Sequence, residues 1–196
     1  NSRANVPADA IRLFKDNGLR LFLVGYESGD QKILNNIKKG VRLDIARRFT
    51  RDCRAIGVSI HGTFILGLPG ETRRTVEETI RFACELDVDT IQVSLAAPYP
   101  GTELHRQASH NGWLPRRGPD PLLHPDGTQN SMLGYPDLPA AEIARALKRM
   151  YARFYFRPRP IARMLAAMAR DPEERGRRLR EGAQFLRFLS ARPSKA

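Results

Sequence analysis

Three apolar runs, each followed by a helical pattern, organise the first half of the chain. They begin near Leu21, Val58 and Thr90, a repeat of roughly 30 residues or more, which is the size of a strand–helix–strand unit. Strict alternation favours a parallel sheet, and right-handed crossovers bring the carboxyl ends of its strands to one rim. Short continuous apolar runs are typical of strands buried on both faces. We therefore expect an α/β fold with its binding residues at that rim.

The central stretch, Gly62–Glu71, reads Gly-Thr-Phe-Ile-Leu-Gly-Leu-Pro-Gly-Glu and leads from the second strand into a helix. Thr75 and Glu78 have the spacing of a capping box, which predicts a helix from about Thr75 to Leu86. Glycine permits turn conformations closed to other residues and lets a ligand approach the backbone. Taken alone, the stretch fits a structural turn as well as a ligand site.

Composition changes twice along the chain and divides it into three parts. Residues 1–112 carry the strand–helix pattern. Residues 113–139 are rich in proline and glycine, which predicts a long loop. Residues 140–196 are helical in pattern, with helices expected around Ile143–Phe154, Ile161–Ala169 and Glu173–Leu189.

The positive charge is concentrated in the last of these parts. Residues 140–196 hold 15 Lys/Arg and 5 Asp/Glu, a net charge of +10, whereas residues 1–139 hold 18 and 16, a net charge of +2. An anionic partner is therefore expected there: lipid head groups, nucleic acid or an acidic domain of the same protein. Nucleic acid is the least favoured of these, because no recognised binding motif accompanies the charge.

Other features of the sequence bear on compartment and completeness. No apolar run approaches the roughly 20 residues of a membrane span, and the first residues do not resemble a signal peptide. They lack an initiator methionine, so we expect the chain to be the middle of a longer protein. Cys53 and Cys84 fall within predicted helices, where small apolar packing roles are expected. So few cysteines suit the cytosol.

Four blocks of sequence occur in a distinctive order: Gly-Tyr-Glu-Ser-Gly, Lys-Lys-Gly, Gly-Thr-Phe-Ile-Leu-Gly-Leu-Pro-Gly-Glu-Thr and Ala-Ala-Pro-Tyr-Pro-Gly-Thr-Glu-Leu. Together they resemble the second half of a radical S-adenosylmethionine (SAM) enzyme of the cobalamin-binding-domain type. The resemblance covers roughly residues 1–165. With the later Phe-Tyr-Phe-Arg-Pro-Arg, the blocks are most similar to the radical SAM proteins of hopanoid biosynthesis.

This resemblance implies an incomplete parallel (β/α) barrel, a partial TIM-like barrel, followed by a helical C-terminal extension. It also implies a [4Fe–4S] cluster that cleaves SAM reductively, giving a radical that takes hydrogen from a hopanoid-type lipid or polyol head group. Three thiolates normally hold that cluster in a Cys-x-x-x-Cys-x-x-Cys motif, which this sequence lacks. We expect the cluster loop in a preceding N-terminal part, and we expect this chain to be inactive alone. Whether a cobalamin domain also precedes it is left open by the sequence.

The resemblance assigns three polar residues to the methionine and ribose parts of SAM. Glu27 would accept hydrogen bonds from the ribose hydroxyls or the ammonium group, Lys39 would lie near the carboxylate, and Arg3 would face the methionyl group. The alternatives are a salt bridge between Glu27 and an arginine, and a solvated helix-end role for Lys39.

Four further residues match the family's adenosine pocket. Thr63 would contribute its hydroxyl, Gly67 and Pro69 the shape of the turn, and Ser94 a strand backbone at the adenine. Packing is the alternative for each of these small residues. Tyr99 and Trp113 border the long loop, either at a substrate mouth or in an aromatic cluster that caps the core.

The histidines, His61, His105, His110 and His124, do not have the spacing of a metal site. Two other functions stay open. The chain could be a non-catalytic basic α/β module that binds an anionic membrane surface or partner, or part of a barrel enzyme without iron. On the main interpretation the protein is cytoplasmic, with peripheral contact to the inner membrane face through its basic helices.

Overall fold

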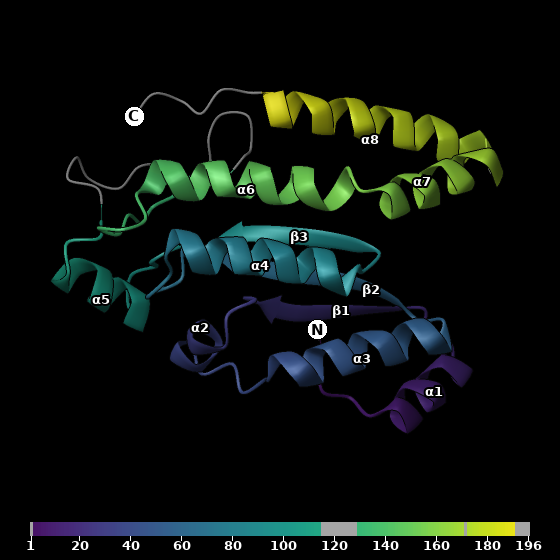
Figure 1. Cartoon of the computed structure of the whole chain (residues 1–196), viewed down its shortest axis with the longest axis horizontal. Helices are drawn as coiled ribbons and strands as arrows, with labels where there is room; N and C mark the ends of the chain where they lie inside the picture. Colours follow the sequence, from purple (N-terminus) through teal and green to yellow (C-terminus); the bar gives the residue numbers. More distant parts are fainter. Residues whose placement is uncertain (1, 115–128, 171, 191–196) are drawn as a thin grey trace.

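The computed structural model describes residues 2–114, 129–170 and 172–190. Its centre is a parallel sheet in the order β1 (Leu21–Glu27), β2 (Ser59–Leu66) and β3 (Thr90–Leu95) (Figure 1). Ser2 adds an isolated parallel bridge to Val24, beside β1. The expected parallel α/β architecture is therefore confirmed.

Five described helices precede, connect and follow the strands in the first part of the chain: α1 (Ala8–Asp16), α2 (Gln31–Asn36), α3 (Leu43–Ile56), α4 (Arg73–Leu86) and α5 (Glu103–His110). Local signals set several of their ends. Asp30 caps α2 by accepting from Lys32 N–H and Ile33 N–H, and Gly57 closes α3 in a left-handed conformation.

The predicted capping box at Thr75 and Glu78 is wrong, and the structure shows why. The helix begins earlier: Thr72 is the N-cap, and the hydroxyls of Thr72 and Thr75 each accept the other's backbone N–H. Glu78 is then one turn inside the helix, where it pairs with Arg74. Two overlapping capping patterns lie side by side in the sequence, and the first of them forms.

One face of the sheet carries the core, packed under α3 and α4 (Figure 1). Phe22 and Val24 of β1 are buried on this face, whereas Leu21 and Leu23, on the other, are 47% and 45% exposed. The expectation that this strand is buried on both faces is therefore wrong. Its alternating burial is the pattern of a sheet with one covered face.

Three helices form the C-terminal part: α6 (Ala140–Tyr155), α7 (Pro158–Arg170) and α8 (Pro172–Ser190). Helix α6 packs against α4 and β3, and its apolar side joins the same core. Among the described helices, none combines the length and apolar character needed to cross a bilayer.

The predicted division of the chain into three parts, with boundaries after residues 112 and 139, stays a prediction. Most of the proline-rich segment, residues 115–128, lies outside the described residues, and Tyr135 and Leu138 in its last part form an isolated bridge.

Candidate cofactor-binding site

At the end of β1 two of the predicted site residues form an ion pair. Lys39 Nζ lies 2.6 Å from Glu27 Oε1, and the two side chains are only 22% and 15% exposed. Glu27 therefore forms a salt bridge, as the alternative interpretation predicts, but its partner is Lys39 and not an arginine. The predicted solvated role for Lys39 is wrong. A carboxylate and an ammonium group, both largely shielded from water, lie at the rim of the sheet.

Local backbone conformation brings this pair together. Glu27 has a positive φ of 64°, and the pairing of β1 with β2 shifts register between Gly25 and Glu27. A Cβ atom on Gly25 would lie 2.4 Å from Glu27 Oε1 and 2.8 Å from Lys39 Nζ. Because Gly25 has no side chain, the two charged groups can pack directly against the backbone of β1 at this residue.

The corner after β2 is held by Glu71. Its Oε2 accepts hydrogen bonds from the backbone N–H of Gly67 (2.6 Å) and of Leu68 (3.2 Å). From the other side, the hydroxyl of Tyr135 donates to the Gly67 carbonyl oxygen at 2.7 Å. Gly67 has a positive φ of 83°, a conformation that favours glycine. The corner is therefore fixed by one side chain of its own, Glu71, and by one from a distant segment, Tyr135.

The Glu71 carboxyl group is buried at a cost to its charged form. Burial raises its pKa to about 7, the hydrogen bonds from Gly67 and Leu68 lower it, and the nearby Asp30 raises it further. Its other oxygen, Oε1, is buried and has no hydrogen-bond partner among the described residues. Glu71 therefore titrates near neutral pH, within the corner that it shapes.

A hollow of about 650 Å³ opens beside β3. Ile65, Leu68 and Leu104 give it an apolar lining, and Ser94 and Gln92 add polar groups from the strand. The open face of the sheet continues beyond it, because Gly25, Thr63 and Gln92 stand in register across the three strands. Thr63 thus shares a row with the glycine beneath the Glu27–Lys39 ion pair.

The outer edge of β3 is closed by side chains. Three alternate backbone N–H groups donate to them: that of Ile91 to the Tyr155 hydroxyl (3.1 Å), that of Val93 to the Tyr151 hydroxyl (2.9 Å) and that of Leu95 to Gln129 Oε1 (2.8 Å). An open strand edge would otherwise present these donors for pairing with another chain. Gln129 and Tyr151 also line the hollow, so the closed edge forms one of its walls.

The structure brings some of the predicted residues together and separates others. Glu27 and Lys39 pair, and Ser94 lines the hollow. Gly67 is turned away toward α6, because a Cβ atom there would meet Ile143 at 3.4 Å. Thr63 and Pro69 are half-buried and Arg3 is exposed. The roles of all seven residues in SAM binding stay predictions.

Neither cysteine fits the cluster that the family resemblance implies. Cys53 is buried in α3 and Cys84 is half-buried in α4, and burial raises the pKa of both thiols. Among the described residues, no group of three His, Cys, Asp or Glu side chains could hold a metal ion. Two thiols on helices that cover the far face of the sheet cannot provide three cluster ligands at the rim.

Reasoning from the sequence missed the residues that shape this region from a distance. The central stretch contains Glu71 without indicating a role for it, and no sequence pattern marks Gln129, Tyr135 or Tyr151. Trp113 packs edge to face on Tyr135 at 4.9 Å, as the aromatic-cluster alternative predicts, whereas Tyr99 is exposed and lines the hollow. The one signal in the sequence is the acidic residue Glu71 directly after the Gly67–Gly70 turn.

Residues 2–83 match the sequence model of the Radical SAM superfamily. An uncharacterized methyltransferase of Pyrococcus horikoshii is 30% identical over 168 residues, which are 82% of this chain and 34% of that protein. Bacteriochlorophyllide d C-8(2)-methyltransferase of Chlorobaculum tepidum is 21% identical over 81% of this chain and 37% of its own length. The chain thus spans about a third of the length of these relatives. The resemblance is confirmed at the level of the superfamily.

Solved structures agree on the fold. Coproporphyrinogen III oxidase from Escherichia coli, a radical SAM enzyme, aligns with a TM-score of 0.56 and 15% identity, over 78% of this chain and 30% of that one. The radical SAM methyltransferase TsrM from Kitasatospora setae aligns with a TM-score of 0.51 and 21% identity, over 81% and 30%. The expected partial radical SAM barrel followed by helices is therefore confirmed.

Proposed function

We infer that this chain, whose residues 2–83 belong to the Radical SAM superfamily, forms one wall of the SAM and substrate chamber of a methyltransferase-type enzyme. The observation that carries this proposal is the shielded Glu27–Lys39 ion pair at the carboxyl end of β1. Parallel α/β folds bind ligands at that end of their strands. The methyltransferase names of the relatives described above favour methyl transfer over the hydrogen abstraction expected from the sequence.

Charge complementarity suggests how the ion pair would serve SAM, which carries both an ammonium and a carboxylate group. Glu27 would accept from the ammonium group or from ribose hydroxyls, and Lys39 would donate to the carboxylate. In the free protein each side chain neutralises the other, so binding exchanges one ion pair for two. Thr63 and Ser94, on the open face of the sheet, would contact the adenosyl part.

The cluster and its ligands lie outside these residues in this proposal. A [4Fe–4S] cluster would supply the electron for reductive cleavage of SAM, and its thiolates would come from another segment of the protein. This chain would orient SAM and, with Glu71 holding the Gly67–Leu68 corner, keep the rim in shape. Cobalamin in a separate domain stays a prediction.

The hollow beside β3 favours a substrate with an apolar body and a polar edge. Its lining is mostly apolar, and the amide of Gln92 can recognise hydroxyl, carbonyl or amide groups. The amide of Gln129 is bound at both ends to the Leu95 backbone. The lipid-like or polyol substrate of hopanoid metabolism stays a prediction. The named relatives do not narrow the choice, since one modifies a bacteriochlorophyllide and another, from Streptomyces wedmorensis, a cytidylyl-2-hydroxyethylphosphonate.

Product analysis tests this function. A protein that carries this chain with a cluster-binding segment would be reconstituted anaerobically with iron and sulfide, then given SAM with a deuterated methyl group and a reductant. S-adenosylhomocysteine together with a deuterated product supports methyl transfer. 5′-Deoxyadenosine alone supports hydrogen abstraction and refutes the methyl-transfer part. Neither product, from a protein shown to contain the cluster, refutes the enzyme proposal.

We also propose a peripheral membrane contact through the basic helices. Large apolar side chains are exposed among the arginines of α7 and α8, namely Met164, Leu165, Leu179 and Leu186. Apolar groups among cations suit the surface of an anionic bilayer. Salt-sensitive co-sedimentation with phosphatidylglycerol vesicles, lost when Leu165 and Leu186 are replaced by Ser, is the expected result. Equal sedimentation of the variant would refute this contact.

A further inference from the structure

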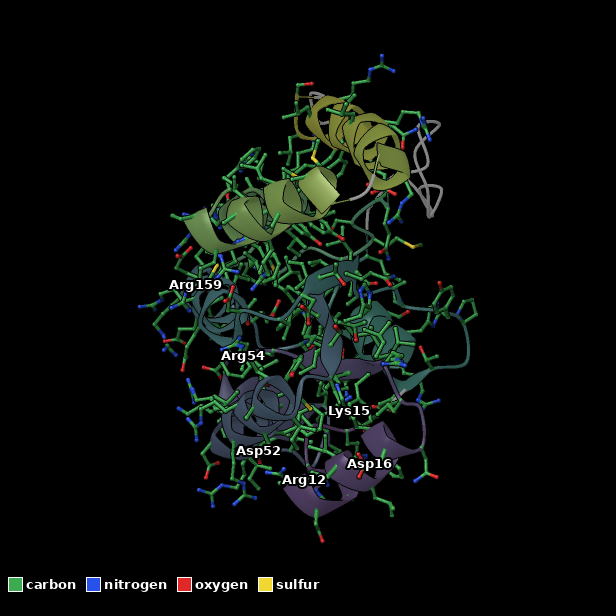
Figure 2. The ribbon with its side chains drawn as sticks, turned by 90° about the vertical axis from the view of Figure 1, so that its right-hand side faces the viewer. Arg12, Lys15, Asp16, Asp52, Arg54 and Arg159 are labelled. Carbon is green, nitrogen blue, oxygen red and sulfur yellow. The ribbon has the colours of Figure 1, made fainter. Side chains whose placement is uncertain are left out.

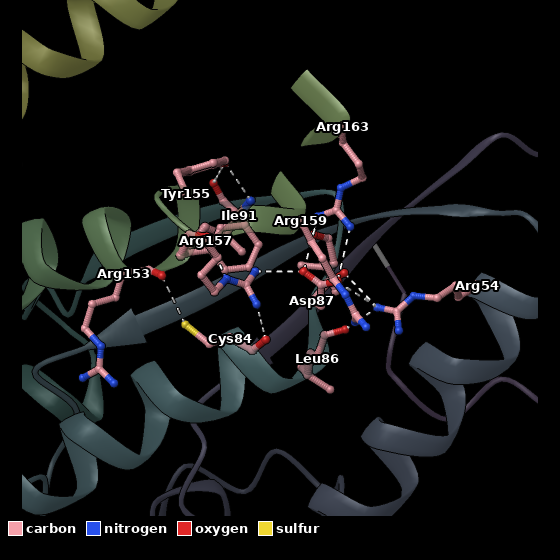
Figure 3. A network of polar contacts seen from close by, with 12 residues as sticks. Arg54, Cys84, Leu86, Asp87, Ile91, Arg153, Tyr155, Arg157, Arg159 and Arg163 are labelled. Carbon is pink, nitrogen blue, oxygen red and sulfur yellow. Dashed lines mark hydrogen bonds and ion pairs between the residues drawn. The ribbon is translucent and has the colours of Figure 1, made fainter. Parts of the chain in front are cut away.

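A second concentration of charge surrounds Asp87, which ends α4. Its side chain is 6% exposed, and four guanidinium groups face its carboxylate (Figure 3). The nitrogen–oxygen distances are 3.0 Å for Arg157, 3.3 Å for Arg163, 3.7 Å for Arg159 and 3.9 Å for Arg54. One buried negative charge is therefore shared by four positive charges.

This cluster lies at the opposite rim from the candidate cofactor site. Asp87 precedes β3 in the chain, whereas Glu27 ends β1, and parallel strands place these positions at opposite ends of the sheet. Figure 2 views the molecule from this end and shows Arg54 and Arg159 on the same face. The charge here is thus separate from the proposed SAM site.

Arg157 acts as the structural partner of Asp87. It is half-buried, stacks its guanidinium over the Phe154 ring at 4.6 Å, and donates to the carbonyl oxygens of Cys84 and Phe154. These contacts tie the junction of α6 and α7 to the end of α4. Arg163 also donates to both carboxylate oxygens of Asp87, at 3.3 Å and 3.4 Å, and to the Val88 carbonyl oxygen. A single guanidinium charge is enough to balance the charge of Asp87.

The other three arginines carry an excess of positive charge toward solvent. Their side chains are 50% (Arg54), 80% (Arg159) and 41% (Arg163) exposed. The hydrogen bonds of Arg54, to the carbonyl oxygens of Leu86 and Asp87, both use Nη2. A guanidinium group stays charged at physiological pH, so deprotonation cannot relieve the repulsion among them.

A hollow of about 290 Å³ lies beside these arginines, with Arg54 and Arg163 in its lining. Two carboxylates, Asp87 and Asp89, also line it. Asp87 is the residue that the guanidinium groups face, and Asp89 Oδ2 accepts the backbone N–H of Ile60 at 2.8 Å. Lys15 adds a cation at the margin, where its Nζ donates to the Gly57 carbonyl oxygen. The hollow therefore has room for a small anion. The cations in and around it, namely Arg54, Arg159, Arg163 and Lys15, outnumber its two carboxylates.

We propose that Arg54, Arg159 and Arg163 bind a phosphate group at this amino-terminal rim. A guanidinium presents parallel N–H donors that match the oxygens of phosphate, and one phosphate can accept from several such forks at once. The phosphate would belong either to a free anionic ligand or to a lipid head group. Nothing in the candidate cofactor site depends on it.

A titration with inorganic phosphate at constant ionic strength, followed by ³¹P NMR and calorimetry, tests this site. We expect saturable binding by the unaltered chain and a dissociation constant raised at least about tenfold in Arg159→Gln/Arg163→Gln. Arg159→Gln alone serves as a second variant, because so exposed a side chain contributes little to folding. The matched control is Arg106→Gln/Arg145→Gln, whose arginines pair with Glu103 and Glu142 elsewhere.

Two results would overturn the proposal: no saturable binding by the unaltered chain, or equal affinities in the double variant and the control. Vesicles then separate the two sources of phosphate. If phosphatidylglycerol vesicles bind through the same arginines and phosphate competes, the ligand is a lipid head group. If phosphate binds through them and vesicles do not, the ligand is a free anion.

Discussion

The carboxylate of Glu71 accepts a 2.6 Å hydrogen bond from the backbone N–H of Gly67, four residues earlier in the chain. The residue that begins the corner after β2 is thus held by the residue that ends it. Because the carboxylate is buried, its protonation is coupled to folding.

Glu71→Gln should remove a pH dependence of stability. Burial raises the pKa from 4.5 to about 7 in the folded state, so between these values the folded chain holds a proton that the unfolded chain has lost. The free energy of unfolding of the native chain should therefore fall by up to ~3 kcal/mol, as pH rises through this window, relative to the variant. Urea unfolding from pH 4 to 8 measures this difference, with Asp9→Asn, at an exposed carboxylate, as control. If the free energy of unfolding changes with pH in the same way for the native chain and for Glu71→Gln, the predicted role of Glu71 is contradicted.

Gly25→Ala should separate the Glu27–Lys39 ion pair. The added methyl group would occupy the space of both charged groups, at 2.4 Å and 2.8 Å. We expect a loss of about 1–3 kcal/mol in stability and faster acylation of Lys39 by an amine-reactive reagent. Gly182→Ala, with no atom near the added carbon, is the control and should not change Lys39 labelling. Unaltered labelling in Gly25→Ala would show that the pair does not need this glycine.

Tyr151→Phe should weaken the closed edge of β3. It leaves the backbone N–H of Val93 without its 2.9 Å acceptor, which costs about 1–2 kcal/mol for a shielded donor. Hydrogen exchange at Val93 should accelerate, while exchange within β1 stays the same. Tyr99→Phe, at an exposed tyrosine, should change hydrogen exchange neither at Val93 nor within β1. Slow exchange at Val93 in Tyr151→Phe would count against a role for the hydroxyl.

Thr72→Ala should destabilise the chain by about 1 kcal/mol, because Thr72 is the N-cap of α4. Glu78→Ala removes the residue that the sequence predicts as part of the capping box. It should lower stability by less than about 0.5 kcal/mol, because Glu78 forms only an ion pair with Arg74 on the helix surface. Thermal or denaturant unfolding compares the two variants directly. A larger loss for Glu78→Ala would restore the capping box that the sequence predicted.

Patterns that are local in the chain predicted the fold well. The alternation of strands and helices depends on residues close in sequence, and it predicted the parallel sheet. Exposure of Leu21 and Leu23 was not predictable in the same way, because a short apolar run does not reveal which faces of a sheet are covered.

The candidate site was predictable only in part. Glu27 and Lys39 lie within two of the sequence blocks that carry the family resemblance. Their pairing depends on a register shift in β1 that no residue pattern predicts. Gln129 and Tyr151 reach β3 from more than 30 positions away in the sequence, and their role follows from tertiary packing alone.

SAM binding by the reconstituted protein tests the central claim most directly. Calorimetry would compare the native protein with Glu27→Gln and Lys39→Met, and with Arg106→Gln on α5 as control. The account predicts that each of the first two weakens SAM binding at least about tenfold while the control has no effect. Native affinity in both Glu27→Gln and Lys39→Met would contradict it.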